Sequence, residues 1–161
     1  MVPTDYGARQ IALHRIVFVL VAYQFVTGGH MTKLFRAAHG GALTDVASVW
    51  TPIHITVGVA ILAAMLWRLY LRGAEGTPPP KQHPALEWLA SAVHIGLYVD
   101  LIGAALVGLV AYFRLPQFAA LHHLMVRQIL FLLFALHFVG TVWHRFVVRD
   151  DVMTRIVRSA R

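Results

Sequence analysis

Two histidines, His123 and His137, lie 14 residues apart on one long apolar segment. On an α-helix this offset is nearly four turns, so both imidazoles share one face of the helix and lie about 21 Å apart along its axis. Imidazole nitrogen is a good axial ligand for iron and other transition metals. The spacing therefore predicts one helix that carries two ligand positions, one above the other.

Two further apolar segments each have a histidine near one end, His14 in the first and His54 in the second. If successive helices alternate in direction, these two ends lie at opposite levels. The chain has no cysteine, which excludes cysteine-ligated iron–sulfur clusters and thioether-attached haem. Histidine is therefore the main candidate ligand for a metal or for a non-covalent haem.

The elements that position these histidines are predicted to be membrane spans. Of the 161 residues 58% are hydrophobic and 13% are charged, and the mean hydropathy is +0.66, which is too apolar for a soluble domain. A span needs about 20 mostly apolar residues. Four stretches qualify: 11–29, 51–71, 87–113 and 123–147. We predict an all-α integral membrane four-helix bundle that forms one domain over residues 1–161.

The short loops indicate the orientation of this bundle. Ten of the 14 lysines and arginines fall on the side of the N-terminus, and Lys33, Arg36, Arg114 and Arg127 fall on the other. Basic residues favour the cytoplasmic side. We therefore expect both termini to be cytoplasmic and the 30–50 and 114–122 loops to be external. Because the basic residues lie at helix ends and in the tails, we expect no nucleic-acid partner.

This orientation sorts the histidines by depth. His54 and His123 fall at the external level, whereas His14 and His137 fall towards the cytoplasm. His94 enters the third span from inside and is a competing inner ligand. The pairs predict two bis-histidine haem b sites, with His54 and His123 on the outer iron and His14 and His137 on the inner iron.

Basic side chains are also available near both predicted sites. Arg68 lies at the level of the inner haem and Arg127 lies one turn after His123, so each is a candidate for binding a haem propionate. Snorkelling to the interface is an equally good reading of Arg68. Gly58 and Gly140 are small residues close to His54 and His137.

The other polar residues have more than one reading. His30, His39 and His83 are expected in loops, and His122 is expected to be a neighbour of the ligand, with a one-residue ambiguity relative to His123. His144 follows His137 by two turns and is either a contact of a quinone headgroup or an interfacial cap. Asp100 lies near the middle of the third span, where it must be protonated, paired or next to a polar cavity.

The sequence resembles the prokaryotic cytochrome b561 family of small four-helix dihaem proteins, which includes bacterial superoxide oxidase. The resemblance rests on ALHRIVFVLVAYQF, PIHITVGVAILAAMLWRLYLR, TPPPKQHP, the third span and the helix with His123, His137 and His144. It implies that the first-span, second-span and two fourth-span histidines bind two haems, and that electrons are exchanged with a membrane quinone.

Two departures from the family pattern stand out. His122-His123-Leu124 replaces a common Trp-His-Glu, and Arg15 replaces a Trp after the first-span ligand. Because the residues around His123 shape the external access, the departures bear on the external donor more than on haem binding.

The leading hypothesis is an electron carrier of the bacterial cytoplasmic membrane, working between an external one-electron donor and ubiquinone or menaquinone. The donor is a small anion, with superoxide preferred by resemblance, or a protein. One alternative is a membrane-anchor cytochrome that relays electrons from a dehydrogenase- or hydrogenase-type subunit. Another is a haem-free transporter or assembly factor.

Overall fold

Residues 5–38, 46–78 and 84–148 are described by a computed structural model of the chain. The first three spans are single α-helices, α1 (Ala8–Ala38), α2 (Val46–Glu75) and α3 (Pro84–Phe113). The fourth span has several parts. They are the 3₁₀ turn η1 (Pro116–Phe118), α4 (Ala119–Leu124), the π-helix η2 (Met125–Ile129), α5 (Leu130–Trp143) and the π-helix η3 (His144–Val148).

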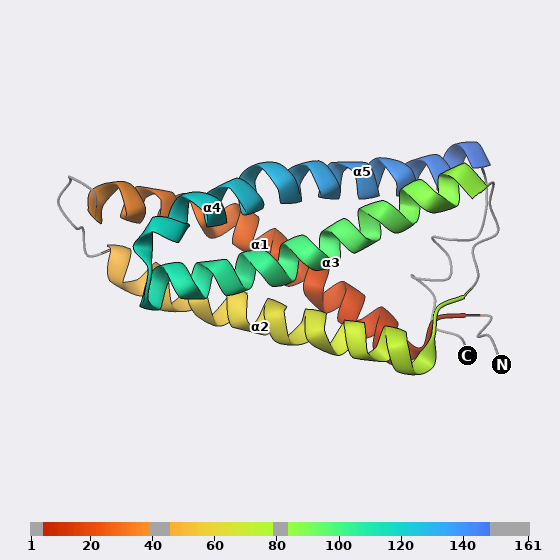
Figure 1. Cartoon of the computed structure of the whole chain (residues 1–161), viewed down its shortest axis with the longest axis horizontal. Coiled ribbons are helices and arrows are strands. Elements are labelled where there is room, and N and C mark those ends of the chain that lie inside the picture. Colours follow the sequence, from red (N-terminus) through yellow and green to blue (C-terminus); the bar gives the residue numbers. More distant parts are fainter. Residues whose placement is uncertain (1–4, 39–45, 79–83, 149–161) are drawn as a thin grey trace.

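The four spans form an all-α bundle. The segments Ala8–Met31, Val49–Glu75, Glu87–Phe113 and Pro116–Val147 are each long and apolar enough to cross a membrane. Successive spans run in opposite directions (Figure 1). α1 packs on α2, α2 packs on α3, and α3 packs on both α4 and α5. The predicted four-helix membrane architecture is confirmed.

The core of the bundle is small: a buried cluster joins three of the spans, and half-buried side chains of α3 pack against it. Val17 and Val21 of α1 pack with three residues of α2 and with Leu130 of α5. Most other large apolar side chains point outward, and Val26 is 83% exposed. Helices that are apolar on all sides suit a lipid environment, because the outer surface needs no polar face there.

Polar contacts fasten the start of α1 to the end of α2. Gly76 has a φ of 75°, the left-handed conformation in which helices commonly end. Gln10 donates from Nε2 to the carbonyl oxygens of Leu71 (3.4 Å) and Gly76 (3.0 Å), and Arg9 forms an ion pair with Glu75 at 2.6 Å. Gln10 thereby supplies a donor to carbonyls that the last turn of a helix leaves unpaired.

The 30–50 and 114–122 loops, which were predicted to be external, are partly helical in the structure and so are shorter than predicted. α1 runs through Gly28-Gly29 to Ala38, and α2 begins at Val46, so residues 30–38 and 46–50 are helical. A glycine in a helix costs about 1 kcal/mol and does not forbid it. His30, predicted in a loop, lies in α1 with its ring stacked on Trp50 at 4.5 Å. Residues 116–124 are also helical. His39 and His83 lie outside the described residues.

The predicted orientation can be tested because the chain has no cysteine of its own. We expect Thr44→Cys, between α1 and α2, to react with a membrane-impermeant maleimide in intact cells. Ser159→Cys, after the fourth span, should react only after the membrane is permeabilised. The reverse labelling pattern would place both termini outside.

Candidate functional site

The histidines of the bundle gather in two groups. The first group contains His14 of α1, His94 of α3 and His137 of α5. The ring centres of His14 and His137 are 6.3 Å apart, and those of His94 and His137 are 5.1 Å apart. The structure thus brings the His14 and His137 rings together.

The second group contains His54 of α2 and the adjacent His122 and His123 of α4. The ring that the structure places against His54 is that of His122, with 6.2 Å between the ring centres. The His122 and His123 rings are 6.1 Å apart. The level predicted for His54 and for the first fourth-span histidines therefore agrees with the structure, but the ring contact involves His122.

The separations within the two cross-helix pairs suit a shared metal. Two imidazoles on opposite faces of one metal have ring centres about 6 Å apart, because each metal–nitrogen bond is about 2 Å long and the ring centre lies about 1 Å further. The His14–His137 and His54–His122 separations are close to this value. The His94–His137 separation is shorter, so His94 is the poorer opposite partner for His137.

The π-helix η2 explains why His122 is brought to His54. The 14-residue offset between His123 and His137 assumes a regular α-helix, but Met125–Ile129 between them is a π-helix. A single π-turn accommodates one extra residue, and each residue turns the helix by about 100°. Across η2 the offset of 15 residues between His122 and His137 therefore corresponds to 14 in a regular helix.

His122 is held in a defined orientation and tautomer. Its Nδ1 lies 2.9 Å from the carbonyl oxygen of Ala104 in α3. A carbonyl only accepts, so the bond requires the proton on Nδ1 and leaves the lone pair of Nε2 for a ligand. Gly108 makes room for this ring, because a Cβ there would lie 2.9 Å from it. A side chain at Gly108 would therefore displace His122.

Gly58 and Gly140, the small residues near His54 and His137, differ in their surroundings. A Cβ at Gly58 would lie 3.7 Å from Nε2 of Gln24, which donates to the carbonyl oxygen of His54 at 2.9 Å. At Gly140 a Cβ would meet nothing within 4 Å in the described structure. Gly58 thus lies next to the hydrogen bond that joins Gln24 of α1 to His54 of α2, whereas the space around Gly140 is open.

Several buried polar atoms lack a hydrogen-bond partner within the described parts of the chain. They include Nδ1 of His54, Nη1 of Arg68 and both carboxylate oxygens of Asp100. Arg68 donates from Nε to the Tyr98 hydroxyl at 3.5 Å. An unpartnered polar atom in a membrane interior is costly and commonly marks a function. These atoms are candidates for contact with a group that the bundle binds.

The remaining predicted residues lie in the fourth span. Arg127 is exposed in η2, and His144 is half-buried at the start of η3.

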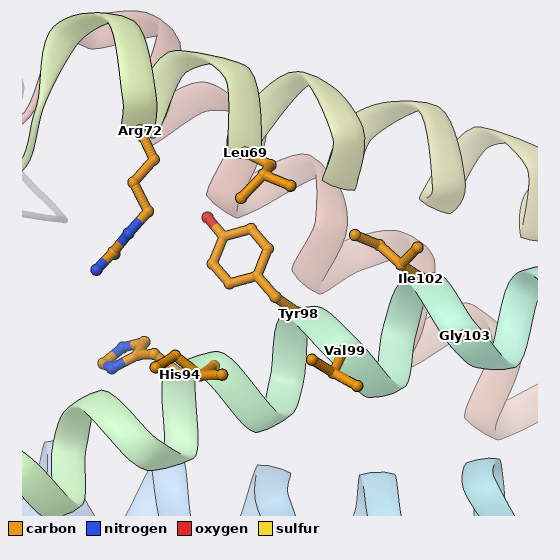
Figure 2. Close-up of a pocket in the computed structure, with 8 residues that line it drawn as sticks. Leu69, Arg72, His94, Tyr98, Val99, Ile102 and Gly103 are labelled. Carbon is orange, nitrogen blue, oxygen red and sulfur yellow. The ribbon is translucent and has the colours of Figure 1, made fainter.

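His94 of α3 lines a pocket of about 440 Å³ between α2 and α3, together with Arg72, Tyr98 and Leu69 (Figure 2). Nδ1 of His94 is bonded to the Ala90 carbonyl at 2.7 Å. Sequence reasoning missed this pocket because only the packing of α2 on α3 creates it.

Comparison with known proteins shows what the chain is similar to. The sequence profile of prokaryotic cytochrome b561 matches residues 5–159. Cytochrome b562 of Cereibacter sphaeroides is 26% identical over 153 residues, which are 95% of each chain. A probable superoxide oxidase, CybB, of Yersinia pestis is 23% identical over 179 aligned positions, covering 97% of each chain. No solved structure matches.

The family profile covers nearly the whole chain, including all four spans and both histidine groups. The resemblance seen in the sequence is thereby confirmed. Membership of this family implies that the chain binds haem b. The chain belongs to the prokaryotic cytochrome b561 family and is a multi-pass membrane cytochrome.

Proposed function

We propose that the chain is a dihaem cytochrome that transfers electrons between an external one-electron donor and the quinone pool of a bacterial cytoplasmic membrane. The observation that carries this proposal is the presence of two cross-helix histidine pairs, His14–His137 and His54–His122, at two levels of one bundle. Two stations at different depths suit electron transfer across the membrane. A single metal site would need only one pair.

The residues at both levels fit a haem. The ring separations suit two histidines that share one iron. Nδ1 of His54 and Nη1 of Arg68 are buried and have no hydrogen-bond partner within the described residues. His14 and His137 would hold the inner haem, with Arg68 as a donor to its propionates. His54 would hold the outer haem with a histidine of α4, and Arg127 would serve its propionates.

For the outer ligand in α4, the sequence and the structure favour different histidines. The 14-residue offset and the family pattern predict His123, which stays a prediction. The ring separation, the bond of Nδ1 to Ala104 and the space at Gly108 favour His122. In the helix register seen here, His122 would therefore hold the outer haem together with His54.

Bound haem supplies reversible one-electron chemistry at each level. The chain would supply histidine nitrogens to hold it, a low-dielectric site that excludes water, and nearby cations. Asp100 is 3% exposed and lies on α3 between His94 and Ala104, whose carbonyl binds His122. A carboxyl at this depth is costly unless it is neutral or paired, so we expect Asp100 to be neutral or paired in the loaded protein.

The external donor and the quinone are the finer parts of the proposal. Superoxide is the preferred donor because a relative that aligns with 97% of the chain is named a probable superoxide oxidase. Exposed Arg114 and Arg127, on the predicted external side, would attract a small anion. Ubiquinone or menaquinone would take the electrons, and a contact of His144 with its headgroup stays a prediction.

Substitution of the adjacent histidines separates the two ligand assignments. In the purified protein we expect His122→Ala to lose about one of two haems, because an iron without its second axial imidazole is held weakly. His123→Ala should keep both haems. Pyridine haemochrome assay against protein concentration measures the ratio. Loss with His123→Ala alone would show that the regular 14-residue spacing holds in the haem-loaded protein.

Superoxide addition tests the direction of transfer. We expect superoxide to reduce the haem absorption bands of the purified protein, and a short-chain ubiquinone to be converted to quinol in the same mixture. Superoxide dismutase should abolish both signals. Haem reduction only after adding a co-purifying dehydrogenase- or hydrogenase-type subunit would instead support a membrane-anchor cytochrome.

A further inference from the structure

The side-chain amide of Gln24 joins α1 to the turn of α2 that carries His54. Gln24 donates from Nε2 to the carbonyl oxygen of His54 at 2.9 Å. A carbonyl oxygen only accepts, so the amide must present its nitrogen here and its oxygen elsewhere. That oxygen, Oε1, is buried and has no hydrogen-bond partner within the described residues. A buried acceptor without a donor is costly in a membrane span, so Oε1 calls for a partner.

The glycine at position 58 lets this amide lie beside the His54 side chain. On a helix a side chain covers the turn before its own Cα, so a side chain at residue 58 would cover His54. A Cβ at Gly58 would lie 3.7 Å from Nε2 of Gln24. The Gln24 amide therefore occupies the space next to His54 that a larger residue at position 58 would take.

His54 has a buried atom of the complementary kind. Its Nδ1 has no hydrogen-bond partner in the described parts of the chain. When Nε2 of a neutral imidazole binds a metal, Nδ1 carries the proton and needs an acceptor. His122 and His94 each have one, because their Nδ1 atoms lie 2.9 Å and 2.7 Å from the carbonyl oxygens of Ala104 and Ala90. For His54 the unpartnered acceptor belongs to the residue that already binds its main chain.

We propose that Gln24 is a positioning residue of the outer haem site, where its Oε1 accepts the hydrogen bond from Nδ1 of His54 while Nε2 binds the iron. The two atoms are not bonded in the present structure, so the pairing needs a turn of the imidazole ring or one bridging water. The proposal rests on the function proposed above, and it holds whether His122 or His123 is the opposite ligand.

The proposed bond has a consequence that a simple link between helices lacks. An acceptor on Nδ1–H raises the electron density at Nε2 and makes the imidazole a stronger ligand. A stronger donor stabilises oxidised iron more than reduced iron, so the bond lowers the midpoint potential of the outer haem. Gln24 therefore acts on one haem only, the one that His54 holds.

The midpoint potentials of the purified, haem-loaded full chain test this role. We expect Gln24→Leu to raise the potential of the haem that His54→Ala loses and to leave the other haem unchanged. The expected size is about a tenfold change in the ratio of reduced to oxidised iron, which is about 59 mV for a one-electron couple. Gln24→Glu keeps an acceptor oxygen, so the potential should stay at or below that of the parent. Potentiometric titration followed in the haem absorption bands measures both haems.

A second glutamine of α1 provides a matched control. Gln10 also donates from Nε2 to carbonyl oxygens at the end of α2, those of Leu71 and Gly76. Gln10→Leu therefore removes the same kind of link between the two spans without touching His54. We expect both potentials of Gln10→Leu to match those of the parent. Equal shifts in Gln10→Leu and Gln24→Leu would show that only the attachment of α1 to α2 matters, and would overturn the proposal.

The possible failures are distinguishable. If the parent holds fewer than two haems, or His54→Ala loses none, the proposed function fails whatever Gln24 does. If the parent holds two haems and Gln24→Leu moves neither potential, the function survives and the role of Gln24 is wrong. A rise in Gln24→Glu like that in Gln24→Leu also overturns the role, because an acceptor is still present. If Gln24→Leu does not assemble, Gln24→Glu decides by the same criterion.

Discussion

In a bilayer the polar groups of a protein have no water to bind, so they must find partners inside the bundle. This constraint acts on the half-buried imidazoles. Helices far apart in the chain bring His14 towards His137, and His54 towards His122. The apolar surface can vary widely as long as it faces lipid, whereas the histidine levels fix how the spans align.

The fourth span shows how a local change in the helix determines which side chain faces the interior. The π-helix Met125–Ile129 lies between the two histidine levels and shifts the register by one residue. α3 stabilises His122 in that register, because the carbonyl oxygen of Ala104 accepts a hydrogen bond from the His122 ring and Gly108 leaves space for the ring. Such π-turns are frequent at functional sites, where they aim a side chain without ending the helix.

Hydropathy and charge were sufficient to predict the four spans, because a membrane helix must be long and apolar. Alternating spans also placed His14 and His137 at one level. The choice between His122 and His123 was beyond this reasoning, since a periodic pattern assumes a uniform helix. The predicted end of the first span at residue 29 was wrong for a related reason, because the glycines at 28 and 29 weaken the helix without ending it, and α1 continues to Ala38. The pocket beside His94 depends on how α2 packs on α3, which no single span encodes.

The central claim is that one bundle holds two haems at two levels, each between histidines of different helices. Haem quantitation on the purified protein, with reduced-minus-oxidised spectra of His54→Ala and His137→Ala, tests it most directly. We predict two b-type haems per chain in the parent and the loss of a different haem in each variant. One haem or none in the parent, or no loss in either variant, would contradict the account.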